Sequence, residues 1–137
     1  MKKFEYKIQI RESLLDVYGH VNNAAYVTHF EECRWEFVST RGCGVNEVMK
    51  MGVGPIILSL KCNFRKELKA REKVTITLEQ LNFRHKVGKL RQQIIKENGD
   101  VACEAEFEFG VFDMQKRRLV EPDEKWRYAL AIDESTN

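Results

Sequence analysis

The segment LLDVYGHVNNAAYVTHFEECR, residues 14–34, holds the turn and the helix start on which the predicted fold depends. Its first half is rich in aspartate, glycine and asparagine, which are typical turn residues. Its second half opens a helical pattern that we expect to run from Ala24 to about Arg41, where Gly42 ends it. Apolar side chains recur along one face of this helix, so that face is predicted to pack on the rest of the domain.

Regions in which apolar and polar residues alternate lie on both sides of this helix and predict strands. The expected strands cover residues 4–10, 56–64, 74–78, 90–96 and 101–109, and short helices are expected at 45–50 and around 126–131. Asn98 and Gly99 favour a tight hairpin turn between the last two strands. This order predicts one α+β domain over residues 1–137, with a curved five-stranded antiparallel sheet wrapped around the long helix. Such a sheet has open edges, which makes pairing with a second copy attractive.

The composition excludes several classes of function. Hydrophobic residues make up 43% and charged residues 32%, and the formal net charge is only +2, so charge alone does not indicate a nucleic-acid partner. The four cysteines form no C-x-x-C pair, and no histidine pair has ligand spacing, so no metal site is predicted. Because no signal peptide and no membrane span is visible, we expect a cytoplasmic protein.

The start of the long helix is the main candidate for a functional site. Unpaired N–H groups at a helix N-terminus carry partial positive charge and can stabilise an anion or a developing oxyanion. Asn22 and Asn23 are suitable capping residues there, and Asp16 lies shortly upstream, with Gly19 allowing a tight bend between them. The segment therefore offers a carboxylate near polarising donors, although turn chemistry alone also accounts for Asp16.

The residues D-V-Y-G-H-V-N-N-A-A-Y, followed by F-E-E-C-R, resemble the motif of hotdog-fold acyl-CoA thioesterases related to 4-hydroxybenzoyl-CoA thioesterase. The matching positions are Asp16, Gly19, His20, Val21, Asn22, Asn23, Tyr26, Glu31 and Arg34. The resemblance implies a hotdog fold and hydrolysis of an acyl or aryl thioester of coenzyme A, or of acyl-carrier protein. It places the site between subunits of a homodimer or homotetramer and implies no metal or redox cofactor.

In the roles that the resemblance implies, Asp16 acts as nucleophile or general base, and the backbone N–H of Asn23 polarises the thioester carbonyl. Tyr18, His20 and Asn22 are candidates for substrate contact, with a loop-bracing role as the alternative for His20. Relatives often carry a second acidic residue at the position of Leu14, and its absence implies changed surroundings rather than lost activity.

Basic residues gather at 64–73, 83–91 and 115–118. Charge runs usually form solvated faces, but coenzyme A carries several phosphate charges. Arg84 and Lys86 in the middle cluster are the candidates for contacting these phosphates. Inside the long helix, Arg34 lies on the apolar face three residues after Glu31, and we expect the two to form a structural ion pair.

Two other functions remain open. Related folds include acyl dehydratases that use a histidine and an acidic residue on the central helix, and His20 and Glu31 would take those parts. In that reaction Asp16 would have no catalytic role. The third possibility is a module that binds acyl-CoA without catalysis, against which the complete motif argues.

Overall fold

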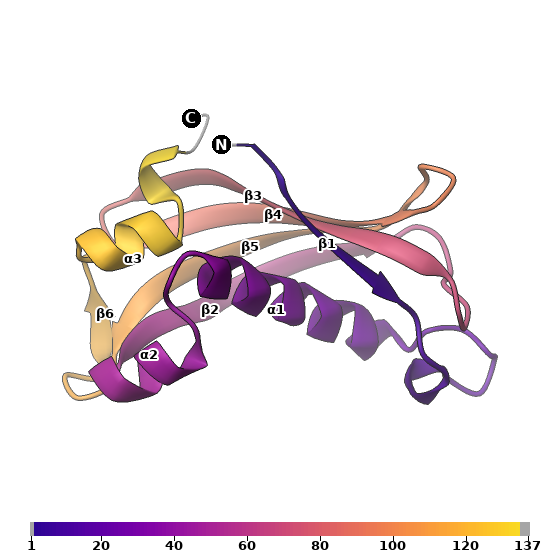
Figure 1. The fold of residues 1–137 in the computed structure, drawn as a ribbon, viewed down its shortest axis with the longest axis horizontal. Coiled ribbons are helices and arrows are strands. Elements are labelled where there is room, and N and C mark those ends of the chain that lie inside the picture. The colour runs from indigo at the N-terminus through magenta and orange to yellow at the C-terminus, as the bar shows by residue number, and fades with distance from the viewer. Residues whose placement is uncertain (1, 135–137) are drawn as a thin grey trace.

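The structure, a computed structural model, describes residues 2–134, which form a curved sheet with a long helix along one face (Figure 1). In chain order its elements are β1 (Phe4–Gln9), the 3₁₀ turn η1 (Glu12–Leu14), α1 (Asn23–Thr40), α2 (Val45–Met51), β2 (Val53–Phe64), β3 (Lys73–Arg84), β4 (Val87–Lys96), β5 (Val101–Asp113), β6 (Arg118–Val120), α3 (Glu124–Ala129) and the 3₁₀ turn η2 (Ile132–Glu134). None of the described helices is long and apolar enough to cross a membrane.

The strands form one antiparallel sheet in the order β1-β3-β4-β5-β2, with β6 paired to the end of β5. The predicted α+β arrangement is therefore confirmed, with a sixth strand that the sequence pattern did not predict. This strand has only three residues, of which the first belongs to the basic cluster 115–118, so apolar alternation has no room to show. β1 and β2 are the two edges of the sheet, and their outer sides have no strand partner among the described residues.

The core lies between α1 and the sheet. Phe30 and Cys33 on α1 are fully buried, and the Phe30 ring meets the Phe107 ring of β5 edge-on, with centroids 5.8 Å apart. Register shifts interrupt the pairing of β2 with β5 after Ile57 and of β3 with β4 after Gln80. Such irregularities bend strands and increase their twist, which lets the sheet curve around the helix.

Most element boundaries differ from the predicted ones by a few residues. β3 continues to Arg84 and β5 to Asp113, because pairing with neighbouring strands extends them past the alternating segments. α3 begins before the predicted position because the Asp123 side chain accepts a hydrogen bond from Trp126 N and caps the helix there.

Candidate active site

The loop between η1 and α1 holds Asp16 in a fixed orientation. Its Oδ1 accepts hydrogen bonds from the backbone N–H groups of Tyr18, at 2.8 Å, and His20, at 3.2 Å. The Asp16 N–H in turn donates to the His20 carbonyl at 2.7 Å. Gly19 has a φ of 78°, a left-handed conformation that favours glycine and allows this tight turn. No hydrogen bond from the described residues reaches Oδ2, so one carboxylate oxygen orients the side chain while the other stays available.

The N-terminus of α1 is capped by one of the two asparagines predicted for this role. Asn22 is the N-cap, and its side chain accepts a hydrogen bond from Ala24 N at 2.8 Å. Asn23 is the first helical residue, one position earlier than predicted. An N–H at that position has no acceptor within its own helix, so it can donate to a bound group.

Asp16 and Asn23 line the same open cavity, which measures about 510 Å³. The structure thus brings these two predicted site residues together, and His20 and Asn22 join them in the lining. The rest of the lining comes from the segment just before α1, from α1, from the end of β2 and from the loop after it, and consists of Val21, Tyr26, Phe64, Arg65, Lys66 and Glu67.

Sequence reasoning missed the contribution of the β2–β3 loop to this cavity. The basic cluster 64–73 was the visible signal, but nothing in its spacing indicated that it folds back onto the Asp16 loop. Val21 N donates to the Leu68 carbonyl at 2.9 Å, which ties the start of the helix to this loop.

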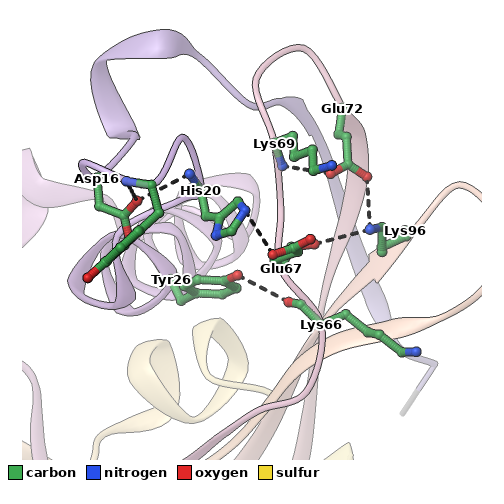
Figure 2. A network of polar contacts seen from close by, with 9 residues as sticks. Asp16, His20, Tyr26, Lys66, Glu67, Lys69, Glu72 and Lys96 are labelled. Carbon is green, nitrogen blue, oxygen red and sulfur yellow. Dashed lines mark hydrogen bonds and ion pairs between the residues drawn. The ribbon is translucent and has the colours of Figure 1, made fainter.

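Side chains add further links between the two loops (Figure 2). His20 Nε2 lies 2.9 Å from a carboxylate oxygen of Glu67, and Tyr26 Oη donates to the Lys66 carbonyl at 3.2 Å. Burial raises the pKa of Tyr26 to about 12, so its hydroxyl remains protonated and can donate at neutral pH. His20 thus has the bracing role considered for it and also borders the cavity.

Other candidate residues lie away from this cavity. Tyr18 points outward with 79% of its surface exposed and contributes its backbone N–H to Asp16 instead. Arg84 ends β3 and Lys86 follows in the β3–β4 turn, whereas the Asp16 loop lies near the start of β3. The strand has twelve residues, and at about 3.3 Å per residue its ends are roughly 36 Å apart. Within one chain, the structure does not bring Arg84 and Lys86 to Asp16.

The residues proposed for a dehydratase also stay apart. His20 lines the Asp16 cavity, whereas Glu31 lines a different one further along α1. The expected ion pair between Glu31 and Arg34 is replaced by other contacts. The Arg34 guanidinium donates to Gln92 Oε1 at 3.0 Å and lies 4.5 Å from the centre of the Phe107 ring, and burial lowers the pKa of Arg34.

Leu14, at the position where relatives often have an acid, packs partly buried against the core. Its carbonyl accepts the Asn22 N–H at 2.9 Å, so the residue supports the loop through its backbone. The change therefore leaves the turn around Asp16 intact.

Comparisons with known proteins identify the family of this chain. A family model described as the Thioesterase-like superfamily matches residues 10–130. The long-chain acyl-CoA thioesterase FadM of Escherichia coli (strain K12) is 28% identical over 115 residues, which cover 83% of this chain and 86% of FadM. The crystal structure of YbaW, a probable thioesterase from Escherichia coli, has a TM-score of 0.79 and 27% identity and covers 92% of this chain and 95% of YbaW.

The structure of the protein SAV2348 from Staphylococcus aureus, solved in complex with CoA, has a TM-score of 0.89 at 19% identity. The match covers 99% of this chain and 87% of SAV2348, so the two proteins share the fold. The predicted hotdog architecture is confirmed by these structures. The chain belongs to the Thioesterase-like superfamily of hotdog-fold proteins, and its predicted class of enzyme, a thioester hydrolase, is confirmed at that level.

Proposed function

We propose that this protein hydrolyses acyl thioesters of coenzyme A, or of acyl-carrier protein, with Asp16 and the N-terminus of α1 as its catalytic groups. The observation that carries the proposal is the shared cavity, which is lined by Asp16, whose carboxylate uses one oxygen to accept backbone hydrogen bonds, and by Asn23, the first helical residue. The name of FadM and the CoA bound to SAV2348 support coenzyme A as the carrier.

The proposed chemistry needs only water as co-reactant, with no metal or redox cofactor. In the general-base route, Asp16 Oδ2 takes a proton from water as the water oxygen bonds to the thioester carbonyl carbon. The Asn23 N–H donates to the resulting oxyanion. The C–S bond then breaks, and the thiolate leaves and takes up the proton. In the nucleophilic route, Oδ2 itself bonds to the carbonyl carbon and releases the thiolate, and water then hydrolyses the mixed anhydride.

A direct test measures release of free thiol from acyl-CoA and acyl-carrier-protein thioesters by the wild-type protein. We expect stoichiometric thiol and free acid. Hydration or dehydration of an enoyl or β-hydroxyacyl thioester without thiol release would instead support the dehydratase reaction. Intact thioesters that remain bound for hours would support a binding module.

We further propose that the functional unit is a homodimer paired through β2. This edge strand exposes a run of apolar side chains, which are Ile56, Ile57, Leu58, Leu60 and Phe64. Exposed apolar edges of this length are suited to pairing with another strand. Two-fold pairing of β2 with a second β2 would continue the sheet through both copies and shield this apolar edge from water.

The same pairing supports a role for Arg84 and Lys86 in binding substrate phosphates. Gly88, beside the β3–β4 turn, pairs with Phe109, which in turn pairs with Ile57, so the turn lies level with the Ile57 end of β2. Antiparallel pairing places that end of one copy beside the Phe64 end of the other. Arg84 and Lys86 of the partner subunit would then lie on the same side of the dimer as the Asp16 cavity.

The double variant Arg84→Ala/Lys86→Ala should raise KM for an acyl-CoA about tenfold, because charge-assisted contacts to phosphate are lost. The effect should shrink at high ionic strength and should be absent with an acyl-pantetheine, which carries no phosphate. The matched control is Lys3→Ala/Lys7→Ala, which removes two exposed charges at β1, the edge of the sheet opposite β2. An unchanged KM in the first variant, together with a raised KM in Arg65→Ala/Lys66→Ala, would contradict the partner contact.

A further inference from the structure

A second cavity, of about 310 Å³, lies between the C-terminal half of α1 and the sheet. Its lining is mainly apolar and includes Phe37, Val38, Ile57, Leu90, Phe109 and Leu130. Glu31, Arg34 and Gln80 are the polar residues in the lining. We refer to it as the inner cavity. The proposed hydrolysis uses none of these residues. The cavity reaches the surface at Ile56 and Ile57, which are 36% and 37% exposed.

An apolar strip on β2, made of Ile57, Leu60, Cys62 and Phe64, connects the Asp16 cavity with the inner cavity. Phe64 borders the Asp16 cavity, where its ring meets Tyr26 edge-on with centroids 5.2 Å apart. Leu60 lies directly opposite Phe107, and residues opposite one another on paired strands share a face of the sheet. Since Phe107 packs on Phe30 of α1, Leu60 also lies on the face that α1 covers.

The same reasoning places both ends of the strip. Ile57 is opposite Phe109, and both line the inner cavity. Cys62 lies between Leu60 and Phe64 on the same face, with its sulfur 3.2 Å from that of Cys103 in the core. The strip therefore consists of Ile57, Leu60, Cys62 and Phe64 and runs along α1 from the Asp16 cavity to the inner cavity. Leu60 and Phe64 remain about half exposed in the single chain.

We propose that this strip and the inner cavity bind the alkyl tail of a long-chain acyl thioester. The proposal rests on the proposed function, because it takes the thioester carbonyl to lie between Asp16 and Asn23. From there the tail runs along β2, and its end enters the inner cavity beside Arg34.

The distance between the two sites sets the length of this tail. Eleven residues separate Asn23 from Arg34, which is roughly 16 Å along the axis at about 1.5 Å per residue. With C–C bonds of about 1.5 Å and angles near 111°, an extended alkyl chain advances about 1.25 Å per carbon, so about 13 carbons reach the inner cavity. A single aromatic ring at the thioester would end well short of it and leave the apolar space unfilled.

The test compares chain-length preference in the wild-type protein and in a variant with a filled cavity. For the wild type, we expect kcat/KM to be higher for hexadecanoyl-CoA than for hexanoyl-CoA or benzoyl-CoA. Leu90→Phe puts a larger side chain into the inner cavity and should lower the ratio of kcat/KM for hexadecanoyl-CoA to that for hexanoyl-CoA at least tenfold. The matched control is Lys61→Phe, which places the same side chain on the opposite face of β2, where Lys61 pairs with Glu106. Its ratio should stay within twofold of the wild type.

Binding gives a second readout that does not depend on turnover. Free hexadecanoate should raise the Tm of the wild type, and it should raise that of Leu90→Phe much less, whereas hexanoate should raise neither. A preference for benzoyl-CoA, or an unchanged ratio in Leu90→Phe, would overturn the proposal. If no thioester of any length is hydrolysed, the proposed function fails, and the Tm measurement still decides whether the alkyl site exists.

Discussion

Asp16→Asn should lower kcat for the best acyl-CoA substrate by about 10³-fold, in the range typical of losing a positioned acid-base group. The amide keeps Oδ1, so it still accepts the N–H groups of Tyr18 and His20 and preserves the turn. The substitution removes the negative charge of Asp16 Oδ2. This oxygen attacks the carbonyl carbon in the nucleophilic route and takes the proton from water in the general-base route. We therefore expect an unchanged Tm and a nearly unchanged KM, measured by thermal unfolding and by steady-state kinetics.

The chain provides a matched control at the other end of the sheet. Asp113 Oδ1 accepts the backbone N–H groups of Gln115, at 2.9 Å, and Lys116, at 3.0 Å, so this aspartate also orients a turn through two backbone donors. The backbone hydrogen bond from Lys116 is the main cause that lowers the pKa of Asp113. Asp113→Asn thus makes the same chemical change in a similar loop and should leave kcat unaffected. If both variants lose activity equally, or if Asp16→Asn keeps wild-type kcat, Asp16 is not the catalytic carboxylate.

Leu58→Asp should convert the proposed dimer into monomers and lower kcat/KM at least about 100-fold, because a buried, unpaired charge costs several kcal/mol. Two-fold symmetry introduces the charge twice into one interface, which increases the effect. Activity falls with dissociation because a lone chain leaves the substrate-binding surface beside β2 open to water. Sedimentation velocity at several protein concentrations, run beside the kinetics, measures both effects.

Met114→Asp is the control for this substitution. Met114 is exposed to 45% and Leu58 to 44%, but Met114 lies in the β5–β6 turn rather than on the edge strand. It should leave the dimer and its activity intact. A wild-type protein that sediments as a monomer while fully active would rule out the β2 dimer as the functional unit.

The parts of the site that could be predicted from the sequence are local in the chain. Asp16, Gly19 and the capping residue Asn22 lie within seven positions, and turn and capping preferences act over such distances. The helix that they start has apolar residues at helical spacing, among them Tyr26, Phe30, Cys33 and Phe37, and its extent is predicted to within one residue at each end.

The rest of the site depends on contacts between residues far apart in the sequence. Tyr26 and Lys66 are 40 residues apart, and the hydrogen bond that joins them follows from how β2 passes α1. Arg34 provides the clearest error. The neighbour Glu31 suggested a pair within the helix, but Gln92, 58 residues away, offers a buried acceptor on the sheet. Periodicity indicates which side of a helix or strand is buried. It does not identify the residues of other elements that this side contacts.

The two edges of the sheet differ in a way that limits assembly. β2 has twelve residues and exposed apolar side chains, whereas β1 has six and carries Glu5 and Lys7. Short edge strands with charged side chains resist the addition of further strands. When two copies pair through β2, both free ends of the joined sheet are β1 strands. In the proposed dimer, strand-by-strand polymerisation into a fibre would therefore be disfavoured, and growth of the sheet would stop at two chains.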